Sequence, residues 1–280
     1  MIRIDPALTV VLVILAGLLG TIIGSFLNVV VWRLPRGESL SHPGSACPKC
    51  GHAIRWYDNI PVVSWLLLRA KCRDCGEPIS ARYPAVELAT GLFFAGVALW
   101  VLLGGLRLES EVAILIATAS FLYLAAISVA LTLIDLDVHK LPNKIVLPAY
   151  VVGVLTLGAA SLLEGDYEQL LRAGIGAAAL FVAYFIMAIV YPGGMGFGDV
   201  KLAGVLGLYL AWLGWGELAV GAFAAFILGG IYSLALIVLR RVNRKSGIPF
   251  GPWMLGGAWV GTFAGGIIAA GYLALFGLGM

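Results

Sequence analysis

Charged residues are scarce in this sequence. Asp, Glu, Lys and Arg make up 12% of the 280 residues, whereas 61% are hydrophobic. The apolar residues form continuous runs of about twenty residues, the length that a helix needs to cross a bilayer. Because these runs do not alternate with polar residues, they exclude a transmembrane β-barrel. The sequence therefore predicts an all-α polytopic membrane protein, and the lack of an evident internal repeat argues against an inverted-repeat transporter.

At about twenty residues per crossing, we expect about eight transmembrane helices. The first run is too long for a signal peptide and lacks a small-residue cleavage site, so we interpret it as a retained anchor. The expected spans are 7–32, 83–104, 112–134, 145–163, 170–191, 200–215, 217–239 and 252–277.

Basic residues are concentrated in alternate loops. The segments 33–82, 135–144, 192–201 and 240–251 contain fifteen of the eighteen Lys and Arg residues. Since positive charge collects on the cytoplasmic side, we expect these segments to face the cytoplasm and both termini to lie outside. The net charge of +3 then reflects membrane topology and does not indicate a nucleic-acid partner.

All four cysteines lie in the polar segment 33–82. They form two Cys-x-x-Cys turns, each followed by glycine, with twenty-one residues between the turns: Cys47, Cys50, Cys72 and Cys75. Such turns can place four thiolates at tetrahedral corners, which predicts a zinc-ribbon-like site. Redox pairs or disulfides are the alternative, but a reducing cytoplasm disfavours them. His52 could replace a ligand, although four cysteines make a surface histidine the better interpretation.

Four sulfur ligands would leave no open position on Zn²⁺, so we expect a structural site that does not activate water. A segment of about fifty residues with few apolar clusters buries little core, and metal binding can supply the missing folding free energy.

Two aspartates lie at the edges of apolar runs, where an ionised carboxylate is costly unless it meets water, a partner or a substrate. Asp135 directly follows the third expected span, and Asp199 directly precedes the sixth, after a glycine-rich connection. Asp199 alone could be a helix cap. The expected topology, however, puts both acids on the cytoplasmic side. Two carboxylates that share one proton can hydrolyse a peptide, because one accepts a proton from water while the other polarises the carbonyl.

Several motifs occur in an order that resembles one family. They are residues 24–35, the two Cys-x-x-Cys turns, residues 79–87, the Asp135 segment and residues 196–199. In this order they resemble the bifunctional bacterial type IV prepilin peptidases, which are related in mechanism to the Gly-x-Gly-Asp membrane aspartic proteases.

The resemblance implies that Asp135 and Asp199 are the catalytic pair, with Gly196, Phe197 and Gly198 forming the turn before the second acid. Asp137 is the rival for the first position. We prefer Asp135 because a proline follows the family's acid at a distance of seven, here Pro142.

The resemblance also implies partners and a location. The enzyme would cut the basic leader from a prepilin or pseudopilin after a glycine and methylate the new amino terminus with S-adenosylmethionine. It would lie in the bilayer of the bacterial inner membrane, and the sequence defines no oligomeric state. The expected domains are a first transmembrane helix at 1–32, a cytoplasmic zinc domain at 33–82 and a membrane peptidase core at 83–280.

The methyltransferase prediction rests on the resemblance, because the sequence has no glycine-rich nucleotide loop of the soluble kind. Glu87 could orient the amine or the sulfonium cofactor, or could instead pair with Arg82 or Lys140.

Two other functions remain open from the residues. A transporter could move protons or cations on Asp135 and Asp199 under control of the zinc domain. A pilus-assembly scaffold would need no chemistry. Placement of both acids at one membrane edge, rather than along a path through the middle, argues against transport.

Overall fold

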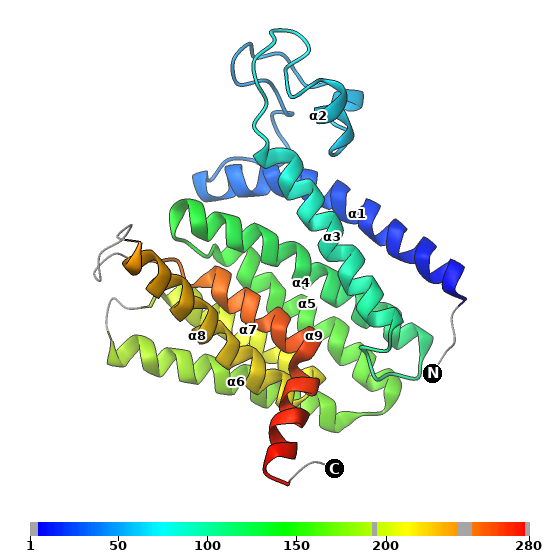
Figure 1. The fold of residues 1–280 in the computed structure, drawn as a ribbon, viewed down its shortest axis with the longest axis vertical. Helices are drawn as coiled ribbons and strands as arrows, with labels where there is room; N and C mark the ends of the chain where they lie inside the picture. Colours follow the sequence, from blue (N-terminus) through cyan, green and yellow to red (C-terminus); the bar gives the residue numbers. More distant parts are fainter. Residues whose placement is uncertain (1–4, 192–194, 240–247, 278–280) are drawn as a thin grey trace. The chain divides into compact units, whose positions relative to one another are not determined.

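The computed structural model describes residues 5–191, 195–239 and 248–277. Within these ranges it is helical and has no strand, as the sequence predicts (Figure 1). The helices are α1 (Pro6–Arg33), η1 (Leu34–Arg36), η2 (Trp56–Asp58), α2 (Val63–Leu67), α3 (Arg82–Leu102), α4 (Glu111–Val138), α5 (Asn143–Glu164), α6 (Tyr167–Val190), α7 (Phe197–Leu213), α8 (Trp215–Val238) and α9 (Gly251–Leu275).

Seven of the helical segments are long and apolar enough to cross a membrane, which confirms a multi-pass membrane protein. They are α1 with η1, α3, α4, α5, α6, α8 and α9. The span expected at 200–215 corresponds to α7, whose 17 residues are not among the seven. At 1.5 Å per residue α7 is about 26 Å long, slightly shorter than the hydrocarbon core. Parts of the loops expected at 192–201 and 240–251 lie outside the described residues.

Local sequence signals set several helix ends. Asp5 caps α1 by accepting the N–H of Ala7 at 2.8 Å, and Pro6 occupies the first turn, where a missing N–H costs nothing. Asp166 caps α6 in the same way through the N–H of Gln169 at 2.8 Å. Gly165 ends α5 with a φ of 71°, a conformation that favours glycine.

The chain forms two compact units, of which the first comprises Met1–Gly104 and Phe121–Ala130. In it, α1 packs along α3. A Cβ at Gly20 would lie 2.7 Å from the carbonyl oxygen of Thr90, and one at Gly91 would lie 2.6 Å from Thr21 Cγ2. Small residues therefore allow this close helix contact, as is common in membranes. The segment between α1 and α3 carries the four cysteines and α2 (Figure 1).

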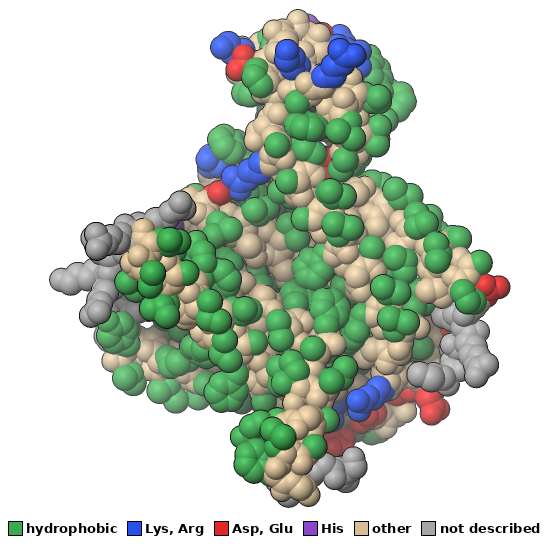
Figure 2. Space-filling view, viewed as in Figure 1, with side chains coloured by type: hydrophobic (Ala, Val, Ile, Leu, Met, Phe, Trp, Pro, Cys, Tyr) green, Lys and Arg blue, Asp and Glu red, His purple; other side chains and the backbone are tan. Residues whose placement is uncertain are grey.

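The second unit comprises Gly105–Ser120 and Leu131–Met280. Its most buried helix is α7, which contacts α5, α6, α8 and α9. Two hydrogen-bonded groups fix α7 inside the unit: the Tyr209 hydroxyl lies 3.0 Å from Ser120 Oγ, and the Trp212 indole N–H donates to Ser161 Oγ at 2.9 Å. Apolar side chains cover most of the helical surface visible in Figure 2, as lipid contact requires.

Candidate active site and metal centre

Asp135 lies in the last turn of α4 and is only 5% exposed, whereas Asp137 is exposed. Its Oδ2 accepts the backbone N–H of Gly251 at 3.0 Å. Gly251 is the first residue of α9. The carboxylate therefore sits at a helix N-terminus, where unpaired N–H groups and the helix dipole favour an acid.

Asp199 lies in the first turn of α7 and is partly buried. Its Oδ2 accepts the N–H of Gly196 at 3.0 Å, and its own N–H donates to the Gly196 carbonyl at 3.0 Å. The helix-cap function that the sequence allowed is therefore present. One carboxylate oxygen of each acid is held by a backbone amide.

Leu141 brings the two acidic segments together. A Cβ at Gly198 would lie 3.0 Å from Leu141 Cβ, and a Cβ at Gly251 would lie 3.2 Å from Leu141 Cδ2 and 2.7 Å from Asp135 Oδ2. Leu141 thus packs between two glycines, one beside each acid. Asp135 is also close enough to act electrostatically on Asp199.

Aromatic rings hold the start of α9 in this position. The Phe250 ring lies 5.4 Å from that of Phe226 on α8 and 6.4 Å from that of Tyr184 on α6, between ring centroids. Tyr184 in turn lies within electrostatic reach of Asp199. Sequence reasoning missed Leu141, Tyr184, Phe250 and Gly251. The only available signal was a Phe-Gly-Pro step at the start of an apolar run, which marks a helix start.

Phe197 faces α6 and Lys201. Its ring makes an edge contact with Phe185 at 6.2 Å, and Lys201 Nζ lies 4.8 Å from its centroid. Lys201 Nζ also donates to Asn143 Oδ1 at 2.9 Å. These contacts tie the first turn of α7 to α5 and α6, which fixes the backbone that carries Asp199.

The four cysteine sulfurs lie within 4.8 Å of one another, and the Sγ atoms of Cys47 and Cys75 are 3.8 Å apart. A tetrahedral site with Zn–S bonds of about 2.3 Å has S···S edges of about 3.8 Å. The thiols therefore fit a zinc ion. They are free rather than disulfide-bonded, and His52 is not in the group.

The two Cys-x-x-Cys turns have the same backbone geometry. In each turn the first cysteine's carbonyl accepts the N–H of a glycine with positive φ, 71° at Gly51 and 74° at Gly76. Each turn is closed by an isolated antiparallel bridge. Backbone N–H groups of Cys50 and Lys49 lower the pKa of the Cys47 thiol to about 7. In the first turn these amides favour the Cys47 thiolate, the form of cysteine that binds a metal.

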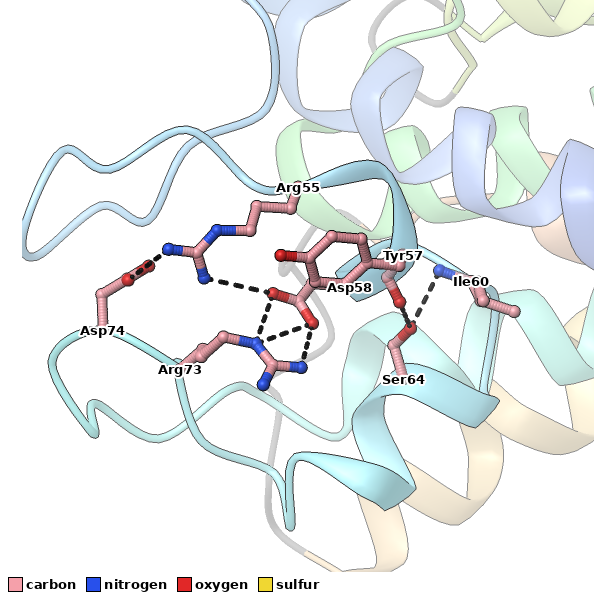
Figure 3. Close-up of polar contacts among 7 residues, drawn as sticks. All are labelled: Arg55, Tyr57, Asp58, Ile60, Ser64, Arg73 and Asp74. Atoms are coloured by element: carbon pink, nitrogen blue, oxygen red, sulfur yellow. Dashed lines mark hydrogen bonds and ion pairs between the residues drawn. The ribbon is translucent and has the colours of Figure 1, made fainter.

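An ionic cluster connects the second turn to the region of η2 (Figure 3). Arg73 donates to both Asp58 oxygens, at 2.6 and 2.8 Å, and the Arg73 hydrogen bonds lower the pKa of Asp58. Arg55 pairs with Asp74 at 3.0 Å. Asp74 lies inside the second Cys-x-x-Cys turn, so these pairs hold that turn against η2.

Glu87 lies in the second turn of α3 and is 8% exposed. Its Oε2 accepts the N–H of Val62 at 2.7 Å. Glu87 therefore anchors the residue that precedes α2.

Comparisons with known proteins show which family this chain belongs to. The Type IV leader peptidase family matches residues 122–234, and the Bacterial Peptidase A24 N-terminal domain matches residues 18–101. The chain belongs to the type IV leader peptidase family. The first match contains both Asp135 and Asp199, and the second contains the four cysteines and Glu87.

Curated members of the family resemble this chain over most of its length. The "Prepilin leader peptidase/N-methyltransferase" of Aeromonas hydrophila is 36% identical over 92% of this chain and 93% of its own. The proteins of the same name from Neisseria gonorrhoeae and Pseudomonas aeruginosa are 35% and 34% identical, over 88% and 93% of both chains. No solved structure matches the chain.

Proposed function

We propose that this chain is a membrane aspartic endopeptidase that removes the basic leader from prepilins or pseudopilins after a glycine, with Asp135 and Asp199 as the catalytic pair. The supporting observation is the packing around Leu141, which brings together acids that are sixty-four positions apart in the sequence. The names of the curated relatives support the substrate class.

In the proposed reaction the two carboxylates share one proton. The ionised carboxylate takes a proton from water, and the protonated one donates a hydrogen bond to the scissile carbonyl. The N–H groups of Gly251 and Gly196 each hold one oxygen of the pair and leave the other for water or substrate. Neither acid forms a covalent intermediate. In this proposal the turn Gly196, Phe197 and Gly198 shapes the site beside the second acid.

We also propose that the enzyme methylates the new amino terminus with S-adenosylmethionine, as the names of its relatives suggest. Glu87 is the carboxylate that we propose for orienting the amine or the cofactor. Its Oε2 accepts the N–H of Val62, so Oε1 is the oxygen that would contact the amine or the cofactor. Zn²⁺ bound by Cys47, Cys50, Cys72 and Cys75 would stabilise the fold around Glu87 and take no part in hydrolysis.

The same proposal places the protein in the bacterial inner membrane, with the zinc domain at 33–82 and both acids on the cytoplasmic side. The supporting observation is the concentration of Lys and Arg in alternate loops. The peptidase core would then be residues 83–280.

The test is mass spectrometry of a purified prepilin incubated with the full chain in vesicles, because loss of the leader and gain of a methyl group are separate mass changes. Asp135→Asn and Asp199→Asn should each lower the cleavage rate by at least about a thousandfold. Asp137→Asn is the matched control, since Asp137 is exposed, and should cleave normally.

Full cleavage by both Asn variants would eliminate the catalytic pair. Cleavage that is absent in every form, together with proton or cation flux into the vesicles, would instead favour the transporter. Omission of S-adenosylmethionine should give a cleaved product without the added methyl mass.

A further inference from the structure

The segment between α1 and α3 exposes several large apolar side chains. Trp56 of η2 is 81% exposed, and on α2 the exposed fractions are 47% for Val63, 61% for Leu66 and 77% for Leu67. Val63, Leu66 and Leu67 have the spacing i, i+3, i+4 and share one helix face. Trp56 lies close to this face in the chain's fold, because η2 contacts α2. We call these four residues the α2 surface.

Hydrogen bonds of Ser64 and Trp65 hold the other side of α2 against the rest of the segment. Ser64 is buried; its hydroxyl donates to the Tyr57 carbonyl and accepts the Ile60 N–H, both at 2.9 Å (Figure 3). The indole N–H of Trp65 donates to the Ile79 carbonyl at 3.0 Å. The α2 surface is therefore held outward by the fold. A contiguous exposed apolar surface of this kind marks a contact with a partner or a membrane.

The contact between Val62 and Glu87 sets the depth of α2. Glu87 lies five residues after Arg82, the first residue of a candidate membrane span, so it lies about 7 Å along the helix. The 2.7 Å hydrogen bond from Val62 places the start of α2 beside this turn. The start of α2 thus lies beside the first turns of this candidate span, the end of the helix that would meet the lipid headgroups.

The backbone conformation at Val62 is unusual, and it indicates that the position of α2 is fixed. Val62 has a φ of 62° and a ψ of −50°, and the N–H of Val63 donates to the Pro61 carbonyl at 2.6 Å. This tight turn is rare and strained for a β-branched residue. Such strain persists only where the surroundings hold it in place, and here the buried carboxylate of Glu87 does so.

Two exposed basic residues lie close to α2 in the sequence. Arg69 and Lys71 lie two and four residues after the end of α2, both are exposed, and neither has an ion pair within the described part of the chain. Arg55 and Arg73, in contrast, are paired with aspartates. An apolar face beside free cations is the composition of an interfacial helix on anionic lipid. Trp56 has the ring type that is enriched at membrane interfaces.

We propose that the α2 surface binds the bilayer and holds the cysteine-bearing segment against the anionic lipid headgroups. Arg69 and Lys71 then contact the lipid phosphates. The partner is the lipid surface itself. This inference depends on the membrane spans and is independent of the proposed peptidase activity.

Photo-crosslinking of the full chain tests this proposal. A photoreactive amino acid replaces Leu67 in protein reconstituted into vesicles of phosphatidylethanolamine and phosphatidylglycerol. The matched control replaces Lys49, whose side chain is 68% exposed in the same segment. We expect lipid adducts at position 67, seen by mass spectrometry, at a yield several-fold above that at position 49. Equal yields at the two positions would overturn the proposal.

Two further measurements distinguish lipid from a protein partner. Addition of a prepilin should leave the lipid adduct at position 67 as the main product; a main adduct with the prepilin or with a second copy of the chain would contradict lipid docking. The double variant Arg69→Gln, Lys71→Gln should lower the lipid yield several-fold, whereas Lys49→Gln should not. An unchanged yield in the double variant would refute the contact with anionic headgroups.

Discussion

At Gly251 a backbone amide, rather than a side chain, contacts a carboxylate of the candidate site. The amide holds Asp135 at 3.0 Å, and the missing Cβ leaves room for Asp135 and Leu141. Gly251 begins α9 in an ordinary helical position. Alanine would therefore be tolerated by the backbone but would crowd the carboxylate.

We expect Gly251→Ala to lower the rate constant for prepilin cleavage by about 10- to 100-fold, because small displacements of a reacting group are costly. The new Cβ would lie 2.7 Å from Asp135 Oδ2. Gly256→Ala is the matched control on the same helix, since its Cβ meets only Leu228 Cδ1 at 3.5 Å. Single-turnover kinetics measure the effect, and a wild-type rate for Gly251→Ala would show that the contact is unimportant.

At the scale of the element, the paired cysteine turns hold together a segment with few buried side chains. Only Cys47 and Ser64 are buried within residues 37–81. A metal ion would therefore contribute much of the folding free energy, as in other small metal-binding domains.

We expect Cys72→Ser, or removal of zinc by a chelator, to unfold this segment and to impair methylation more than cleavage. Elemental analysis should find zinc in the wild type, and limited proteolysis should show faster cutting within residues 33–82 of the variant. His52→Ser is the control and should keep its zinc. Normal stability and both activities without bound metal would contradict a structural zinc site.

The ion pair between Asp58 and Arg73 predicts a pH dependence for the same segment. Because Arg73 lowers the pKa of Asp58 in the folded state, the pair stabilises the segment above the unfolded pKa and loses this effect as pH falls through the folded value. Asp58→Asn should therefore destabilise the segment by a constant amount from about pH 7 to pH 5, and the difference should shrink only below about pH 4. Hydrogen exchange of peptides from residues 55–75, in wild type and variant, measures the difference. A difference that grows on acidification would contradict the ion-pair explanation.

At the scale of the whole molecule, the number of crossings depends on α7. Seven helical segments are candidate spans, and α7 has 17 residues. If α7 also crosses, the number of crossings is even and both termini lie on the same side of the membrane. The prediction from the positive charges puts them outside.

Alkaline phosphatase fused after Met280 should therefore be active, because the enzyme folds only outside the cytoplasm. The matched control is a fusion after Lys140, in a segment expected in the cytoplasm, which should be inactive. An inactive fusion after Met280 would show that α7 does not cross.

The helices, their approximate ends and the clustering of the four cysteines could be predicted because they depend on neighbours in the sequence. Continuous apolar runs define spans, and two Cys-x-x-Cys turns carry their own geometry. The choice of Asp135 over Asp137 as the catalytic residue was harder to make from the sequence. Residues two apart point to nearly opposite sides of a helix, so Asp135 and Asp137 cannot both face inward. Packing decides which, and it buries Asp135.

Contacts between distant residues were decided only by the tertiary structure. The bond between Gly251 and Asp135 joins residues 116 positions apart, and the bond between Val62 and Glu87 spans 25 positions. Each depends on a backbone amide, which every residue type except proline supplies, so no residue type marks it in the sequence. Composition and periodicity thus fixed the membrane class and the chemical groups, whereas helix packing determined which of those groups meet.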